Sequence, residues 1–369
     1  MKKLCLCFVI LSSILFNGCF NYIDIDKVIF ATAVVVDIDE QNFPIVYVEA
    51  YKAARGGQGS SGKGVRVLFK GTGKTLFEIL RDLNLSSSYR INYTQVKGVI
   101  FTQKAAEKGL DRFIDIFDRD QEFVLRSQVV VYRGDPSALL GVKLKGQDYI
   151  GLFIHDLIYN ISSSSRGVIT TLNDFLNKNY TKYNAIAVPM VVIKKEQVEN
   201  KIELDSAAII KDYKMVGQLE RADEEAYNFL VNKVYGGSME VSNPISIDDF
   251  ISLEILKNRT ETRVYYDGKT IHIKKIINTK TSITEVQKKL KLSKQSLESL
   301  QRNAESNIVK LCSMLYDEYK SQGIDAFNLT EDFHRKYPKE NIDNVIARSE
   351  LEIEAHVIIE TSTDISDFR

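Results

Sequence analysis

The chain has 369 residues, of which 44% are apolar, enough for about two or three globular domains. Lys+Arg and Asp+Glu both number 49, and this near-neutral balance argues against a general nucleic-acid-binding protein. Beyond the first residues, no apolar run approaches the length of about 18 residues that a membrane-spanning helix needs.

The first residues have the layout of a secretory signal peptide. A short positive segment opens the chain, and an apolar run from Leu4 to Phe16 follows it. Gly18 then precedes Cys19 directly, as in the lipobox of bacterial lipoproteins, although Phe16 stands where a Leu is usual. We therefore expect residues 1–18 to be a lipoprotein signal peptide and Cys19 to carry lipid. An ordinary signal peptide or a membrane anchor with a chance cysteine is the alternative.

Cysteine usage agrees with an exported, lipid-anchored chain. Of the four cysteines, Cys312 alone follows Cys19, so the folded part has no pair for an internal disulfide. No CxxC motif or Cys/His cluster predicts a metal site. Acyl chains such as palmitate on Cys19 would anchor the protein firmly, because each buried methylene adds about 0.8 kcal/mol.

The first predicted element after the signal peptide is a β-hairpin. Residues 28–37 and 43–50 are rich in β-branched and aromatic side chains and flank a polar turn. The Gly/Ser segment 54–64 that follows cannot bury a face, so it predicts a flexible loop.

The stretch VRVLFKGTGKTLFEIL, residues 65–80, resembles a nucleotide-binding loop in its order of strand, Gly-rich turn and helix. That motif requires a glycine at position 68, which is Leu68 here. Thr75 and Glu78 have the spacing of a capping box, in which Thr75 accepts from the Glu78 amide and Glu78 from the Thr75 amide. We expect a strand, a glycine turn and a capped helix that binds neither ATP nor GTP.

Strand and helix patterns alternate from here to residue 195. Residues 93–102 and 127–134 predict strands on either side of the helical spacing over 103–120, and 184–195 predict a third strand, with Pro189 suggesting a sheet edge. Further helices are predicted at Asp135-Pro136, 152–158 and 169–176. This alternation predicts a mixed α/β layer domain.

A polar, charged interval from Lys194 to Lys201 is the candidate domain boundary. Beyond it the patterns predict a hairpin, a helix and several strands, one pair of them joined at an Asp267-Gly268 turn. The segments are 203–219 for the first hairpin, 221–234 for the helix, and 238–247, 259–277 and 350–360 for the strands.

One long helical pattern runs from Thr284 to Gln322, with a single apolar stripe among charged and polar residues and Gly323 placed to end it. We expect this helix to pack across its own sheet; a partner-binding surface or coiled-coil seam is the alternative. Cys312 lies beside Leu311 and Leu315, so we expect a small core residue rather than a nucleophile.

No catalytic constellation stands out. The acidic pairs Asp248-Asp249 and Glu224-Glu225 fit helix starts or solvated faces, and the serines of 162–165 lack a Gly-x-Ser-x-Gly context. We expect His272 and His356 to be surface or partly buried residues of a sheet. The four histidines fall on separate elements and are His155, His272, His334 and His356. The sequence therefore predicts no catalytic residue, cofactor or metal site, and a protein that is not an enzyme.

Four segments together resemble the GerC-type spore germination lipoproteins. They are FNYIDIDKVIFATAVVVDID after the lipobox, GTGKTLFEILRDLNLSSSYRINYTQVKGVIFTQKAAEKGL, DSAAIIKDYKMVGQLERADEEAYNFLVNKVYGG, and YKSQGIDAFNLTEDFHRKYPKE after the long helix. The resemblance lies in their order and spacing and extends over essentially the whole mature chain.

This resemblance implies the C subunit of a nutrient germinant receptor that acts in spore germination. It implies a lipoprotein on the outer face of the inner spore membrane, with integral-membrane A- and B-type receptor subunits as partners. Whether this subunit meets the nutrient germinant directly or only through those partners stays open. A solute-binding lipoprotein of a transport system is the alternative, although the chain shows no clear repeat of a lobe.

The resulting expectation is a multi-domain α+β fold, with mixed sheets packed against helices. The N-terminal germination-protein domain would comprise residues 19–195, with two subdomains as one option. The C-terminal domain would comprise residues 203–369 and contain the long helix.

Overall fold

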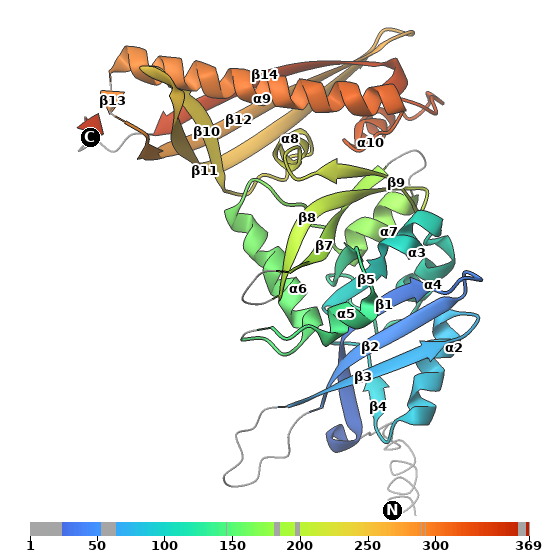
Figure 1. Cartoon of the computed structure of the whole chain (residues 1–369). Coiled ribbons are helices and arrows are strands. Elements are labelled where there is room, and N and C mark those ends of the chain that lie inside the picture. Colours follow the sequence, from blue (N-terminus) through green and yellow to red (C-terminus); the bar gives the residue numbers. More distant parts are fainter. Residues whose placement is uncertain are drawn as a thin grey trace, which may run out of the picture.

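Two mixed β-sheets organise the chain, a nine-stranded sheet and a four-stranded sheet on which the longest helix lies (Figure 1). The structure is a computed structural model. It describes residues 24–52, 64–144, 146–180, 185–195, 200–288, 290–291, 293–360 and 367–368. The predicted multi-domain α+β class is confirmed.

The larger sheet has the strand order β3-β2-β1-β5-β6-β7-β8-β9, and β4 pairs with β1. Its central strands β1, β5, β6 and β7 run parallel, while hairpins at both ends are antiparallel. Strands buried on both faces, as β5 is, suit such a parallel centre. The bounds are β1 Val28–Ile38, β2 Pro44–Lys52, β3 Val65–Thr72, β4 Arg90–Asn92, β5 Gly98–Thr102, β6 Gln128–Tyr132, β7 Ala185–Lys195, β8 Asn200–Lys211 and β9 Lys214–Glu220. The predicted hairpins are β1/β2 and β8/β9.

Helices cover both faces of this sheet because alternate strand residues point to opposite sides. Val34 and Val99 pack in one core with α2, α3, α4 and α7. Val35 and Ile100 pack in the other core with α5 and α6. The bounds are α2 Leu76–Asp82, α3 Gln103–Lys108, α4 Asp111–Arg119, α5 Pro136–Gly141, α6 Ile150–Tyr159 and α7 Leu172–Tyr180, with one-turn helices η1 Ile25–Lys27, η2 Leu83–Ser86 and η3 Asn160–Ser163.

Three predictions in this half were wrong in detail. The strand predicted from Tyr93 begins only at Gly98, after a turn in which the Val96 N–H donates to the Tyr93 carbonyl. The helix predicted over 103–120 is two helices, because Gly109 has a φ of +129°, which a helix cannot include. Pro189 lies on β7, an interior strand, and not at the predicted sheet edge. The pairing of β7 with β6 begins only at Met190, so it does not require the N–H group that proline lacks.

The smaller sheet has the order β10-β11-β12-β14 and was expected from its strand patterns. β11 and β12 form the predicted hairpin, with Gly268 at a φ of +93° in its turn. β14 returns parallel to β12. The bounds are β10 Ser238–Asn243, β11 Ser246–Tyr266, β12 Ile271–Val286, β14 Ser349–Glu360, α8 Glu224–Leu230, α9 Lys294–Gln322, α10 Leu329–Lys336 and η4 Ile346–Arg348, with a short pair of β13 Leu290–Lys291 and β15 Asp367–Phe368.

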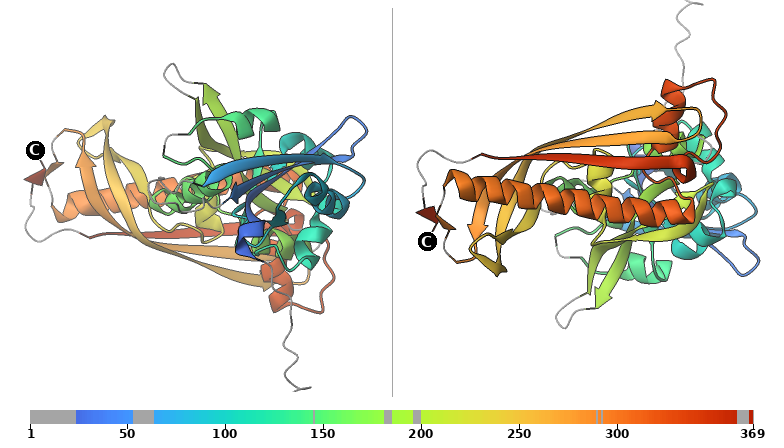
Figure 2. Two further views of the ribbon diagram at one scale, coloured as in Figure 1. Left: turned by 90° about the horizontal axis from the view of Figure 1, so that it is seen from below. Right: turned by 90° about the horizontal axis from the view of Figure 1, so that it is seen from above.

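α9 lies along the smaller sheet beside β14 (Figure 2) and buries most of the predicted apolar stripe, although Leu311 of that stripe is exposed. The helix begins at Lys294 rather than at Thr284, because β12 continues to Val286 and Ser293 caps the helix. Gly323, at a φ of +66°, ends it as predicted. Packing of this helix across its own sheet is therefore confirmed.

The larger sheet continues through the charged interval at 194–201, since β7 pairs antiparallel with β8 on its far side. The region of the larger sheet also contacts the segment around α10. The Ala185 N–H donates to the Asp325 carbonyl at 2.8 Å, and Lys178 forms an ion pair with Glu331. The domain division at this interval remains a prediction.

Candidate functional site

The predicted lipid-attachment residue, Cys19, lies outside the described residues, as does most of the predicted loop 54–64. The described chain begins at Asp24, and β1 starts at the end of the molecule farthest from α9 (Figure 1). In the part of the chain that the structure describes, no helix is long and apolar enough to cross a bilayer.

The stretch 65–80, which resembles a nucleotide-binding loop, forms the whole of β3, a turn and most of the capped helix α2. Thr75 is the N-cap, and its Oγ1 accepts from the Glu78 N–H at 3.2 Å, as predicted. The reciprocal bond differs from the prediction, because the Glu78 carboxylate accepts from the Lys74 N–H at 2.8 Å instead of the Thr75 N–H. The amides of this turn are therefore directed to the helix cap.

Both glycines of this stretch are explained by packing. A Cβ at Gly71 would lie 2.6 Å from Ile79 Cγ2, and one at Gly73 would lie 2.9 Å from Ile79 Cγ1. Real side chains do not approach so closely, and Ile79 is buried in the core between α2 and the sheet. The glycines let α2 approach β3, which accounts for them without a phosphate.

The sequence reasoning missed a buried carboxylate, Glu49, in the middle of β2. It is fully buried and accepts from the backbone N–H groups of Ile150 at 2.9 Å and Gly151 at 3.0 Å, which begin α6. Thr32 Oγ1 at 2.7 Å and Arg66 Nε at 2.6 Å also donate to it. The signal was present in the sequence as one acidic residue inside an apolar strand. The carboxylate holds the positive end of α6 against the sheet.

The pair Glu224-Glu225 lies at the start of a helix, α8, which was one of the two predicted positions. Both residues are buried, so the alternative of a solvated face is wrong. Burial raises the pKa of Glu224 to about 7, while Arg221 nearby acts in the opposite direction. Burial also raises the pKa of Glu225, which Arg166 opposes at 3.5 Å. The pair Asp248-Asp249 lies in β11, not at a helix start, and Asp248 is exposed, as the alternative of a solvated face predicted.

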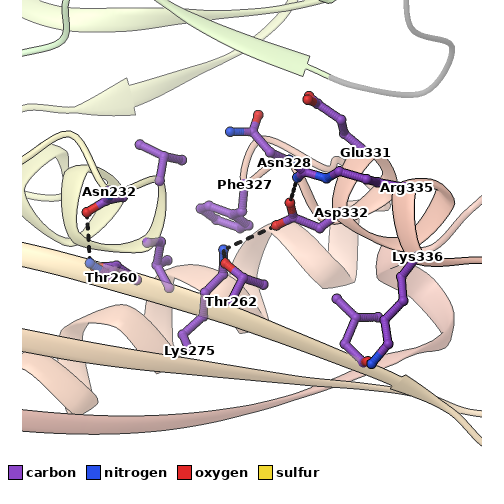
Figure 3. Close-up of a pocket in the computed structure, with 13 residues that line it drawn as sticks. Asn232, Thr260, Thr262, Lys275, Phe327, Asn328, Glu331, Asp332, Arg335 and Lys336 are labelled. Carbon is purple, nitrogen blue, oxygen red and sulfur yellow. Dashed lines mark hydrogen bonds and ion pairs between the residues drawn. The ribbon is translucent and has the colours of Figure 1, made fainter.

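A polar pocket of about 650 Å³ opens between α8, β11, β12 and α10 (Figure 3). We call it the α10 pocket. Its volume is in the range of small-molecule sites. Its polar lining residues are Asn232, Thr260, Thr262, Lys275, Asn328, Glu331, Asp332, Arg335 and Lys336.

Lys275 on β12 is the buried cation of the α10 pocket. Its Nζ donates to Thr262 Oγ1 at 2.8 Å, and the Asp332 carboxylate lies 3.9 Å away, too far for a hydrogen bond. Burial lowers the pKa of Lys275, and the nearby carboxylates of Asp332 and Asp325 oppose that shift. Asp332 itself accepts a hydrogen bond from Arg335 (Figure 3).

Asp325 fixes the wall of this pocket by capping α10. Its buried carboxylate accepts from the N–H groups of Phe327 and Leu329 at 3.1 Å, and from Thr330 N–H and Oγ1 at 2.6 Å. These bonds satisfy amides that the start of a helix leaves free. The residues belong to the stretch 319–340 that carried part of the family resemblance.

The remaining candidate chemistry falls on separate elements. His272 and His356 are half-exposed on β12 and β14 beside carboxylates, as predicted. Cys312 is fully buried in the core under α9, also as predicted, and burial raises the pKa of its thiol. Across the described residues, no group of three His, Cys, Asp or Glu side chains is placed to hold a metal ion.

Comparison with known families gives two adjacent matches. The family model described as "Spore germination protein N-terminal domain" matches residues 21–193. The model described as "Spore germination B3/ GerAC like, C-terminal" matches residues 205–363. Together they cover nearly all of the chain after the predicted signal peptide.

Similar proteins carry related names. The chain is 22% identical over 281 residues to spore germination protein GerQC of Bacillus cereus, covering 76% of each chain. It is 21% identical over 231 residues to the putative spore germination protein YfkR of Bacillus subtilis (strain 168), covering 61% of this chain and 60% of that protein.

A solved structure shares the fold. The crystal structure of the GerBC protein matches with a TM-score of 0.59 at 16% identity, covering 89% of this chain and 97% of that one. At this identity the likeness establishes the fold, while the two family models establish the relationship. The chain belongs to the GerC-type family of spore germination proteins.

Proposed function

We propose that the protein is the C subunit of a nutrient germinant receptor, held by lipid on Cys19 at the outer face of the inner spore membrane. It acts without catalysis, by contacting integral-membrane A- and B-type subunits during nutrient-triggered germination. The observation that carries the proposal is the pair of consecutive germination-family matches over 21–193 and 205–363.

The test of the receptor role is deletion of the gene in the organism that encodes the chain. Spores without the protein should lose less optical density than wild-type spores when given at least one nutrient mixture. Restoring the wild-type gene should restore the response. Normal germination of the deletion strain with every nutrient tried would contradict the proposed role.

The lipid anchor is tested separately, with a matched pair of cysteine variants. Cys19→Ala should abolish incorporation of labelled palmitate and release the protein from the membrane fraction, because no acyl chain then holds it. Cys7→Ala, within the predicted signal peptide, should keep both label and membrane association. Palmitate labelling that persists in Cys19→Ala would place the lipid elsewhere.

The alternative of a solute-binding lipoprotein has less support from the fold. Such proteins usually have two similar lobes around a cleft, whereas the sheets here have nine and four strands in different orders. Calorimetric titration of the protein with candidate solutes, combined with the germination assay, separates the two functions. Tight solute binding together with normal germination of the deletion strain would favour the alternative.

A further inference from the structure

The α10 pocket carries more cationic than anionic groups. Lys275, Arg335 and Lys336 line it, against the two carboxylates of Glu331 and Asp332. One of these carboxylates, on Glu331, is already paired with Lys178 of α7, outside the pocket. Counted over all five groups, the lining has an excess of one positive charge, which favours an anionic ligand.

Asp325 is a second carboxylate near Lys275, but it accepts no hydrogen bond from the lysine. Both of its oxygens are taken by the start of α10, and Asp325 is not among the residues that line the pocket. Asp332, the nearer acid, gives one oxygen to Arg335 and lies 3.9 Å from Lys275. One carboxylate is thus shared between two cations.

The hydrogen bonds of Lys275 leave room for another acceptor. An ammonium has three N–H donors, and Thr262 Oγ1 at 2.8 Å accepts one of them. A buried cation is stable when it is paired and fully hydrogen-bonded, and this one has no carboxylate within hydrogen-bond distance among the described residues. An anion beside Lys275 would supply both the charge and the acceptor.

Amide groups at the mouth of the pocket provide further donors. Asn232 Oδ1 accepts from the Thr260 N–H at 2.8 Å, which leaves its Nδ2 as a donor. Asn328 also lines the pocket, at the start of α10. Both asparagines have left-handed backbones, with φ of 59° and 64°, a conformation in which asparagine is enriched among residues other than glycine.

We propose that the α10 pocket binds a small organic molecule through a carboxylate group, with Lys275 as the buried partner and Arg335 as the partner at the rim. The pocket is large enough to enclose the rest of such a molecule. Its polar lining suits hydroxyl or amide substituents better than a hydrocarbon chain. A ligand site goes beyond the proposed function, which assigns only a lipid anchor and contacts with partner subunits.

The test uses ligand-observed NMR of the full-length protein in detergent, with lactate as the probe. Lactamide is the control ligand, because it has the same shape without the charge. We expect saturable binding of lactate and at least about tenfold weaker binding of lactamide, since only lactate compensates the buried ammonium.

Two lysine variants assign the binding to the pocket. Lys275→Met should weaken lactate binding at least about tenfold, because the methionine keeps much of the volume and removes the charge. The matched control is Lys274→Met, the next residue of β12, whose side chain is paired instead with Glu352 and Glu354. Its lactate affinity should be unchanged.

Arg335→Gln tests the pocket even if Lys275→Met fails to fold. The Arg335 side chain is 69% exposed, so its replacement leaves the core intact. It should weaken lactate binding a few-fold with unchanged circular dichroism. No saturable lactate signal up to about 50 mM would overturn the proposal, as would equal lactate affinity of the wild type and both pocket variants.

Discussion

Replacing Glu49 by alanine tests whether one buried carboxylate holds α6 on the larger sheet. In the wild type this side chain accepts hydrogen bonds from two α6 amides, from Thr32 and from Arg66. Alanine removes all four acceptor contacts at once and leaves the Arg66 guanidinium without its partner in a largely buried position. The side chain of Glu49 is also inaccessible, so solvent cannot replace the lost bonds without a structural change.

The expected loss follows from these contacts. Leaving a buried donor without an acceptor costs about 1–3 kcal/mol, and breaking a buried ion pair costs about 3–5 kcal/mol. The contributions overlap because they share one carboxylate, so we expect Glu49→Ala to lower the free energy of unfolding by about 4 kcal/mol. Glu49→Gln keeps one acceptor oxygen and should lose about half as much.

Urea denaturation of the full-length protein, followed by circular dichroism, measures the global effect. Hydrogen exchange of the peptide covering 150–159 measures the local one, and it should become faster in Glu49→Ala. Glu254→Ala, at an exposed position of β11, is the control and should change stability by less than about 0.5 kcal/mol. A loss below about 1 kcal/mol in Glu49→Ala, with unchanged exchange in α6, would refute the reasoning.

Three further predictions concern the buried Glu224, the close approach at Gly71 and nucleotide binding. Burial raises the pKa of Glu224 from 4.5 to about 7, so between these two pH values the folded protein binds more protons than the unfolded chain. The free energy of unfolding should therefore fall as the pH rises from 4.5 to about 7. Glu224→Gln should remove this slope and raise the free energy of unfolding at pH 8 by up to about 3 kcal/mol; an unchanged slope would contradict it. Gly71→Ala should lower stability by about 1–3 kcal/mol, because the new Cβ meets Ile79. Equilibrium dialysis with labelled ATP should show no saturable binding to wild type or variant, and saturable binding would revive a phosphate site.

Local patterns were enough to predict most elements of the fold. Strands of β-branched residues, the Asp267-Gly268 turn and the stripe of α9 are encoded within short windows, so their types were correct. Predicted element boundaries were wrong where pairing with another element sets the boundary. For example, β12 extends to Val286, into the start of the predicted long helix. Pro189 was misplaced for a similar reason, since an interior strand tolerates proline only where the adjacent ladder has not begun.

The pocket and the buried carboxylate could not be predicted from local windows. Lys275 shares a face of its strand with Ile273 and Ile277, two residues to either side, which indicates a buried position. Its partner Asp332, however, comes from a helix much later in the chain. Glu49 likewise meets α6 only through the packing of the sheet. The sequence contains the unusual residue in each case, while the identity of its partner depends on the tertiary structure.

The parallel return of β14 to β12 determines when the smaller sheet can be completed during folding. α9 and α10 both lie between these strands in the chain, so β12 keeps an open edge until β14 pairs with it. Sheets that join distant segments close slowly, and an open strand edge can pair with other chains. The last strand of the larger sheet ends at Glu220, so all of its strands come far earlier in the chain. A nonsense mutation before Ser349 would therefore produce a chain with one complete sheet and one aggregation-prone edge.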